Sequence, residues 1–238
     1  MIITNGTVFT DTCTFEKRDI ELKGSTILDI KETSQSETQP AAFPNSDSFS
    51  NEVQLDATDC YVIPGLIDIH FHGCVGYDFC DGTIEAMEKI AAYELSSGTT
   101  SICPATMTLP VETLESICQT ASQYVSSGAS PLVGINLEGP FISEIKKGAQ
   151  NKNYIIKPNI ELLKQLQKDS SGLVKLVAIA PEEEGAIDLI SALKSEFVFS
   201  IAHTNANYQI AMDAFHAGAS HVTHLYNAML PFTHREPG

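Results

Sequence analysis

The stretch Tyr61-Val-Ile-Pro-Gly-Leu-Ile-Asp-Ile-His-Phe-His-Gly73 carries the strongest indication of fold in this chain of 238 residues. A run of β-branched and apolar residues ends in two histidines, His70 and His72, spaced two residues apart. Residues i and i+2 of a strand lie on the same face, so both imidazole rings can point to one place. The stretch predicts a strand that ends in a pair of metal ligands, although histidines at a strand end can also be simple polar caps.

Strands and helices alternate after this stretch, as the periodicity of the apolar residues indicates. The predicted strands are 66–70, 99–103, 132–137, 174–180, 197–202 and 221–224. The predicted helices are 83–96, 111–127, 159–168, 185–194 and 207–217. This alternation predicts an α/β fold with a parallel sheet, namely an incomplete (β/α)8 TIM-type barrel with about six βα units, over residues 64–238.

The first 63 residues have a different pattern. Short runs of strand-forming residues predict the N-terminal part of a small β-sandwich. Asn5-Gly6 and Lys23-Gly24 have the composition of hairpin turns. Residues 33–52 are rich in small polar residues, and we predict a mobile loop there.

Composition restricts the classes of function. The net charge of −16 argues against nucleic acid or an anionic membrane as a partner. No apolar run approaches the length of a membrane span, and no signal peptide is visible at the start. The six cysteines form no Cys-x-x-Cys pair, which favours a reduced, cytoplasmic location with Cys60, Cys103 and Cys118 as buried thiols.

Further candidate ligands stand at the ends of later predicted strands. Glu138 follows the third strand, His203 the fifth and His224 the sixth. In a parallel barrel these ends share one rim, where such folds place their active sites. Imidazole and carboxylate groups are suitable ligands for zinc or iron. Together with His70 and His72 they predict a site for one or two divalent metal ions.

Two other histidines fit structural roles. His216 lies late in a predicted helix, where the helix dipole favours a histidine. His221 begins a strand, at the face opposite the rim. The polar segment 139–151 follows Glu138 directly and is either a solvated connection or a lid over a substrate.

Five motifs carry a resemblance to a known family. They are Pro64-Gly-Leu-Ile-Asp-Ile-His-Phe-His-Gly, Leu137-Glu-Gly-Pro-Phe, Lys147-Gly-Ala-Gln, Ala202-His-Thr-Asn-Ala, and Thr223-His-Leu-Tyr-Asn-Ala-Met with Arg235-Glu-Pro-Gly. Together they resemble the N-acetylglucosamine-6-phosphate deacetylase family, which belongs to the amidohydrolase superfamily. The first motif marks only the superfamily, whereas the last one is specific to the family.

The resemblance implies a metal-dependent hydrolase that converts N-acetylglucosamine 6-phosphate to glucosamine 6-phosphate and acetate. It implies that Glu138, His203 and His224 hold the principal metal and that His70 and His72 support a second one. The family's catalytic aspartate is expected beyond Gly238. We therefore assign no catalytic residue within the chain and expect it to be a fragment of a longer enzyme.

The resemblance also implies how the amino-sugar phosphate, a small-molecule partner, is bound. Ala149 and Gln150 would line the sugar site, and Asn227 and Ala228 would contact the sugar phosphate. Arg235 would reach a phosphate in the neighbouring subunit of a homodimer; its planar guanidinium can donate two parallel hydrogen bonds to such a group.

Two other functions stay open at the level of sequence. One is a different amidohydrolase, such as a deaminase or a cyclic-amide hydrolase, although the Leu225-Tyr-Asn-Ala-Met motif argues against it. The other is a non-catalytic protein that binds a sugar phosphate or a metal.

Overall fold

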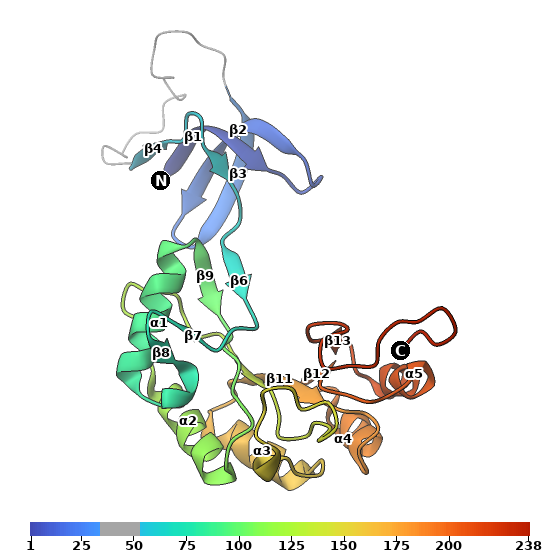
Figure 1. Cartoon of the computed structure of the whole chain (residues 1–238). Helices are drawn as coiled ribbons and strands as arrows, with labels where there is room; N and C mark the ends of the chain where they lie inside the picture. The colour runs from blue at the N-terminus through green and yellow to red at the C-terminus, as the bar shows by residue number, and fades with distance from the viewer. Residues whose placement is uncertain (34–52) are drawn as a thin grey trace. The chain divides into compact units, whose positions relative to one another are not determined.

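The structure, a computed structural model, describes residues 1–33 and 53–238. Apart from Thr33, the predicted mobile loop at 33–52 lies outside the described residues. The chain divides into two compact units, an N-terminal unit Met1–Pro64 and a C-terminal unit Gly65–Gly238. Figure 1 shows the elements of each unit along the chain.

The described residues of the N-terminal unit form a five-stranded sheet built around the first strand. The strands are β1 (Ile2–Phe9), β2 (Phe15–Lys23), β3 (Thr26–Glu32), β4 (Gln54–Asp56) and β5 (Tyr61–Val62). β1, β2 and β3 pair antiparallel in chain order, and β4 and β5 both pair parallel with β1. The described residues of the N-terminal unit are therefore rich in strands, as the sequence predicts.

The prediction of a hairpin turn at Asn5-Gly6 is wrong. β1 continues through these residues, and its register with β2 shifts between Ile3 and Gly6. Asn5 has a positive φ of 62°, and its N–H donates a hydrogen bond of 2.9 Å to Asp19 Oδ1. Asparagine and glycine favour left-handed backbone in a bulge as well as in a turn, so composition alone does not separate the two. Lys23-Gly24, by contrast, does join β2 to β3.

The C-terminal unit alternates strands and helices, so the α/β prediction is confirmed. Its parallel strands are β6 (Leu66–Asp68), β9 (Thr99–Ile102), β10 (Ile135–Leu137), β11 (Val174–Ile179), β12 (Val198–Ile201) and β13 (His221–Val222). β6 pairs with β9, and β10 to β13 pair in chain order. Isolated parallel bridges, Ile102 to Leu132 and Ala105 to Asn136, link the two groups. The incomplete barrel stays a prediction.

In the C-terminal unit, where every residue is described, five α-helices follow the strands in turn (Figure 1). They are α1 (Ile84–Ser96), α2 (Val111–Gln123), α3 (Ile160–Asp169), α4 (Ala186–Leu193) and α5 (Tyr208–Ala217). The side chains of Thr83, Asn159 and Asn207 accept hydrogen bonds from the first turns of α1, α3 and α5, which fixes where these helices begin. Shorter elements are β7 (Gly73–Cys74), β8 (Tyr77–Asp78) and the 3-10 helices η1 (Phe79–Asp81) and η2 (Lys152–Tyr154).

The core of the C-terminal unit lies between the strands and these helices. Its largest fully buried side chains include Phe79, Phe141 and Phe199. The apolar faces of α2, α3 and α4 and the strands β10, β11 and β12 contribute further side chains, such as Leu114, Leu163 and Val177. None of the helices in the described part of the chain has the length and apolarity needed to cross a lipid bilayer.

The cysteine predictions are partly correct. Cys103 and Cys118 are buried, and burial raises the pKa of each thiol to about 12, which makes both unreactive at neutral pH. Cys60 is exposed, so that prediction is wrong. It lies in the short connection between β4 and β5, where the apolar run that suggested burial has not yet begun.

We expect Gly65→Ala to destabilise the start of β6. A Cβ atom on Gly65 would lie 2.0 Å from Thr100 Oγ1 and 2.3 Å from Thr100 Cγ2 on β9. Overpacking of this kind typically costs about 1–3 kcal/mol. Thermal unfolding of Gly65→Ala, Thr100→Ala and the double variant measures it. The double variant should recover part of the loss, because Thr100→Ala removes the two nearest atoms; purely additive effects would contradict this account.

Candidate metal centre

Four imidazole rings converge on one buried carboxylate in the C-terminal unit. The Nε2 atoms of His224, His203 and His72 lie 3.1, 3.2 and 3.2 Å from oxygens of Glu138, and that of His70 lies 3.4 Å away. Each residue follows the C-terminal end of a strand: β6, β10, β12 or β13. Since these strands run parallel, their ends meet at one edge. The structure therefore brings together all five residues that the sequence suggests as ligands.

The two histidines after β6 lie just beyond the strand. Asp68 Oδ1 accepts the N–H of His70 at 3.0 Å, which ends the strand two residues earlier than predicted. The backbone nevertheless stays attached to the segment after β9, through Cys103 N–H to Asp68 O at 2.8 Å and Ala105 N–H to Phe71 O at 2.7 Å. These bonds keep both imidazole rings directed to Glu138.

The histidines after β12 and β13 have unusual backbone conformations. His203 has a φ of +43° and His224 a φ of +33°, a left-handed region that residues other than glycine rarely adopt. Hydrogen bonds hold these turns: Ser143 N–H donates to His203 O at 2.9 Å, and Asn227 N–H to His224 O at 2.8 Å. Thr204 N–H bonds to the carbonyl of Ala228 at 3.0 Å and so joins the two turns.

Glu182 supports the turn that carries His203. Its carboxylate accepts the N–H of Asn205 at 2.5 Å and the hydroxyl of Thr204. Glu182 was not among the residues predicted from the sequence to form the site. The rule that selected Glu138, an acid just after a predicted strand, would have selected it too, because Glu182 follows β11.

Three of the four rings have their tautomer set by the main chain. The Nδ1 atoms of His72, His203 and His224 lie 3.2, 3.0 and 3.1 Å from carbonyl oxygens. Those carbonyls belong to Ala105, Lys146 and Asn227. A carbonyl oxygen only accepts, so each Nδ1 carries the proton. The Nε2 atoms then present lone pairs, as metal-ligating histidines do.

Charge at the centre favours a bound cation. Glu138 is only 2% exposed. Burial alone would raise the pKa of its carboxyl, but contacts with His203, His72 and His70 outweigh burial and hold that pKa below its ordinary value when these rings carry protons towards it. In the neutral Nδ1–H form the same rings turn lone pairs to the carboxylate. His203 Nε2 and His224 Nε2 lie 3.2 Å apart, so two lone pairs face each other beside an anion. A cation removes this repulsion.

The donor set fits a divalent transition metal. One nitrogen each from His70 and His224 and one oxygen from Glu138 lie within 4.8 Å of one another. Nitrogen and carboxylate oxygen are ligands that zinc and iron both accept. Glu138 Oε1 faces His70, His203 and His224, whereas Oε2 faces His72. The carboxylate can therefore serve ligands on both of its sides.

Gln150 contacts the carboxylate directly. Its Nε2 donates to Glu138 Oε2 at 2.9 Å, and its Oε1 accepts the N–H of Thr108 at 2.7 Å. Thr108 in turn donates its hydroxyl to the carbonyl of Glu138 at 3.3 Å. Sequence reasoning assigned Gln150 to the sugar site and missed this contact, which orients Glu138.

The other residues suggested for substrate binding lie in different segments of the C-terminal unit. Asn227 and Ala228 lie in the turn after β13, where their carbonyls bond to His224 and Thr204. Ala149 is exposed beside Gln150. Arg235 is exposed in the segment after that turn.

The two histidines expected to be structural contact none of these ligands in the described chain. His216 lies in the last turn of α5. His221 Nδ1 lies 2.8 Å from Ser200 Oγ, a contact that joins β13 to β12.

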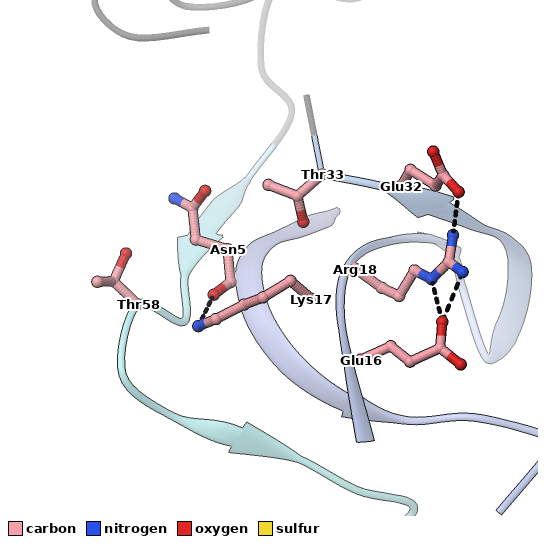
Figure 2. A pocket seen from close by; sticks show the side chains of 7 residues that line it. All are labelled: Asn5, Glu16, Lys17, Arg18, Glu32, Thr33 and Thr58. Atoms are coloured by element: carbon pink, nitrogen blue, oxygen red, sulfur yellow. Dashed lines mark hydrogen bonds and ion pairs between the residues drawn. The ribbon is translucent and has the colours of Figure 1, made fainter. Parts of the chain in front are cut away.

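A hollow of 760 Å³ lies in the N-terminal unit, and Figure 2 shows its lining side chains. Its cations are already engaged: Arg18 forms ion pairs of 2.6 Å with Glu16 and 3.4 Å with Glu32. Lys17 Nζ donates to Asn5 O at 3.2 Å. Because these charges satisfy one another and none of the described residues that line the hollow is a histidine or cysteine, we assign the chemistry to the centre around Glu138.

Comparisons with known proteins indicate the family. The signature of the amidohydrolase family matches residues 61–234. An N-acetylglucosamine-6-phosphate deacetylase of Bacillus subtilis (strain 168) is 41% identical over 196 residues, which cover 80% of this chain and 49% of that protein. An N-acetylgalactosamine-6-phosphate deacetylase of Escherichia coli O157:H7 is 35% identical over 178 residues, or 74% of this chain and 47% of that protein.

A solved structure extends the similarity to the fold. It is a variant N-acetyl-D-glucosamine-6-phosphate deacetylase from Mycobacterium smegmatis in complex with N-acetyl-D-glucosamine-6-phosphate. Its TM-score is 0.83 at 28% identity, over 100% of this chain and 58% of that one. The chain spans about half the length of the curated relatives it matches.

We expect the purified protein to bind zinc or iron and to lose it when the centre is altered. Glu138→Ala and His203→Ala remove two groups that face the same point, so each should reduce metal content to a small fraction of the unaltered value. Elemental analysis after removal of free metal measures this. His216→Ala is the control, since His216 lies on α5. Unchanged metal content in both Glu138→Ala and His203→Ala would show that the centre is misassigned.

Acidification should weaken metal binding as the pH falls through the raised pKa of His72. Contact with Glu138 raises the pKa of His72 above its usual 6.5. A ligating histidine must be neutral, so affinity is full above this pKa and falls as the pH drops through it. Chelator competition between about pH 8 and 6 measures the midpoint. His72→Ala should move the midpoint down; an affinity that stays constant to about pH 6 would contradict the expectation.

Proposed function

Because the chain belongs to the amidohydrolase family, we propose that it forms the metal-binding part of a deacetylase that acts on N-acetylglucosamine 6-phosphate. The reaction hydrolyses the acetamide and yields glucosamine 6-phosphate and acetate. The observation that carries the proposal is the buried Glu138 carboxylate, faced by imidazole Nε2 lone pairs. The 41% identity to the Bacillus subtilis deacetylase supports the choice of substrate class.

The proposed metal ligands divide into two groups. Glu138, His203 and His224 would hold the principal ion, and His70 and His72 would support a second one. When bound, a zinc or iron ion at this position supplies a water of lowered pKa and polarises the amide carbonyl. The protein's own part is to keep the carboxylate ionised and the lone pairs directed inwards.

The surroundings of the carboxylate restrict how it can move. Gln150 holds Glu138 Oε2, and Thr108 holds the Glu138 carbonyl. Outer partners of this kind fix the orientation of ligands and commonly change metal affinity by about 10–100-fold when altered. Gln150 would therefore serve the metal centre as well as the sugar site, a role that the family resemblance implies.

Substrate binding is proposed for the turns that border the centre. Asn227 and Ala228 would contact the sugar phosphate, and Ala149 and Gln150 would line the sugar. Arg235, exposed after the same turn, would reach a phosphate in the neighbouring subunit of a homodimer. A chain with a net charge of −16 needs such a local cation to attract an anionic substrate.

The group that moves the proton is not assigned to any described residue. In general such a group takes the proton of the attacking water and passes it to the leaving amine. The aspartate expected beyond Gly238 for this role stays a prediction, as does the fragment nature of the chain. The proposal for these 238 residues is thus limited to metal and substrate binding.

N-acetylgalactosamine 6-phosphate is the second candidate substrate. The Escherichia coli relative named for that compound is 35% identical over 178 residues. The two sugars differ only in the configuration of one hydroxyl, so the same metal centre serves either. Selectivity would come from residues that touch the sugar ring.

The protein expressed from its natural gene should release acetate from N-acetylglucosamine 6-phosphate in a metal-dependent way. His203→Ala should lose at least about 100-fold in kcat/KM, because the principal metal is lost with it. An acetate assay with both amino-sugar phosphates gives the ratio of kcat/KM values and so selects the substrate. His216→Ala is the matched control and should keep full activity. Metal-loaded, folded protein that acts on neither sugar but opens a cyclic amide would refute the proposed substrate class.

A further inference from the structure

His70 differs from the other three histidines in what its Nδ1 atom faces. Main-chain carbonyls occupy that position at His72, His203 and His224. At His70 the neighbour is a side chain: Asn136 Nδ2 lies 3.2 Å from His70 Nδ1. Asn136 belongs to β10, two residues before Glu138, and is 1% exposed.

The orientation of the Asn136 amide follows from its second contact. Nδ2 also lies 2.9 Å from the carbonyl oxygen of Ile69. A carbonyl accepts only, so the NH2 end of the amide must face it. Turning the amide would bring Oδ1 against the Ile69 oxygen, which puts two acceptors in contact. Oδ1 has no hydrogen-bond partner among the described residues, so no competing bond favours the turned form.

An NH2 group that faces His70 Nδ1 donates to it. A neutral imidazole that accepts at Nδ1 carries its proton on Nε2. His70 Nε2 lies 3.4 Å from Glu138 Oε1, so that proton points to the carboxylate. The ring is thereby a hydrogen-bond donor to Glu138, whereas its three neighbours present lone pairs.

We propose that Asn136 is a positioning residue that holds His70 in the Nε2–H tautomer. His70 can therefore bind a metal ion through Nε2 only after this tautomer changes. Ligation through His70 Nε2 requires the proton to leave that atom and requires the Asn136 contact to change. An ion bound by Glu138, His203 and His224 needs neither step. An ion that depends on His70 therefore binds more weakly, by a factor on the order of the 10–100-fold by which a change of outer partner alters metal affinity.

This consequence for the second ion rests on the proposed metal centre, but the tautomer is a property of the metal-free protein. Imidazole ¹⁵N chemical shifts of histidine-labelled, metal-free protein report it directly. We expect the ring whose signals His70→Gln removes from the spectrum to be in the Nε2–H form. We expect the rings of His72, His203 and His224 in the Nδ1–H form. Detection of His70 as Nδ1–H would overturn the proposal.

Asn136→Ala tests the cause. Removal of the amide frees His70 Nδ1, so the ring should move towards the Nδ1–H form. Titration with zinc should then show the weaker ion binding about 10-fold more tightly. Thr106→Val is the control. Thr106 N–H bonds to Asn136 O at 2.9 Å, and the buried Thr106 hydroxyl has no hydrogen-bond partner among the described residues and so bonds to none of the proposed ligands. Thr106→Val should change neither the tautomer nor the titration.

The outcomes separate this inference from the proposed function. Unaltered protein that binds no zinc, yet shows His70 as Nε2–H, would refute the metal centre and support the role of Asn136. A tautomer and a second-ion affinity that are both unchanged in Asn136→Ala would overturn that role while the metal centre stands. If Asn136→Ala does not fold, the ¹⁵N spectrum of the unaltered protein decides alone.

Discussion

A single carboxylate, ionised and almost completely buried, is the constraint on which the C-terminal unit depends. Burial of an unpaired charge is costly, so Glu138 must be surrounded by groups that stabilise its anion. The strand ends supply these groups, because parallel strands deliver their last residues to one edge. Even unfavourable backbone is tolerated for this purpose, as the left-handed conformations of His203 and His224 show.

Local support around the centre offsets that backbone strain. Glu182 holds the turn after β12 through Thr204 and Asn205, and the turn after β13 bonds to the same segment. The segment after Glu138 crosses to His203, where Lys146 supplies a carbonyl. Each loop at this edge is therefore fixed by another loop, so a change in one alters the direction of a ligand carried by the next.

Much of the fold could be predicted from sequence because its signals are local. Apolar periodicity located the strands and helices of the C-terminal unit, and side chains such as Asn159 and Asn207 fixed helix starts. The predictions of local structure failed where a contact of a single side chain determined the backbone conformation. Asp68 ended β6 early by accepting the N–H of His70, and Asn5 formed a bulge in place of a turn. Neither contact has a signature in composition.

The ligand positions could also be predicted, since an acid or histidine just after a strand is visible in the sequence. Their partners could not. Gln150 and Glu138 are twelve residues apart in the sequence, and Asn136 and His70 are sixty-six apart. Both contacts therefore depend on the tertiary structure. The carbonyls that orient three of the rings belong to the main chain. Every residue has such a carbonyl, so the sequence does not indicate which ones bond to the histidines.

That difference between main-chain and side-chain partners has a consequence for how the protein can evolve. No single substitution deletes a backbone carbonyl, so the acceptors at His72, His203 and His224 are insensitive to point mutation. The partner of His70 is encoded by one codon. An asparagine codon lies one nucleotide from codons for aspartate, histidine and serine. Position 136 is therefore where drift or selection can alter one ligand of the centre while leaving the other three untouched.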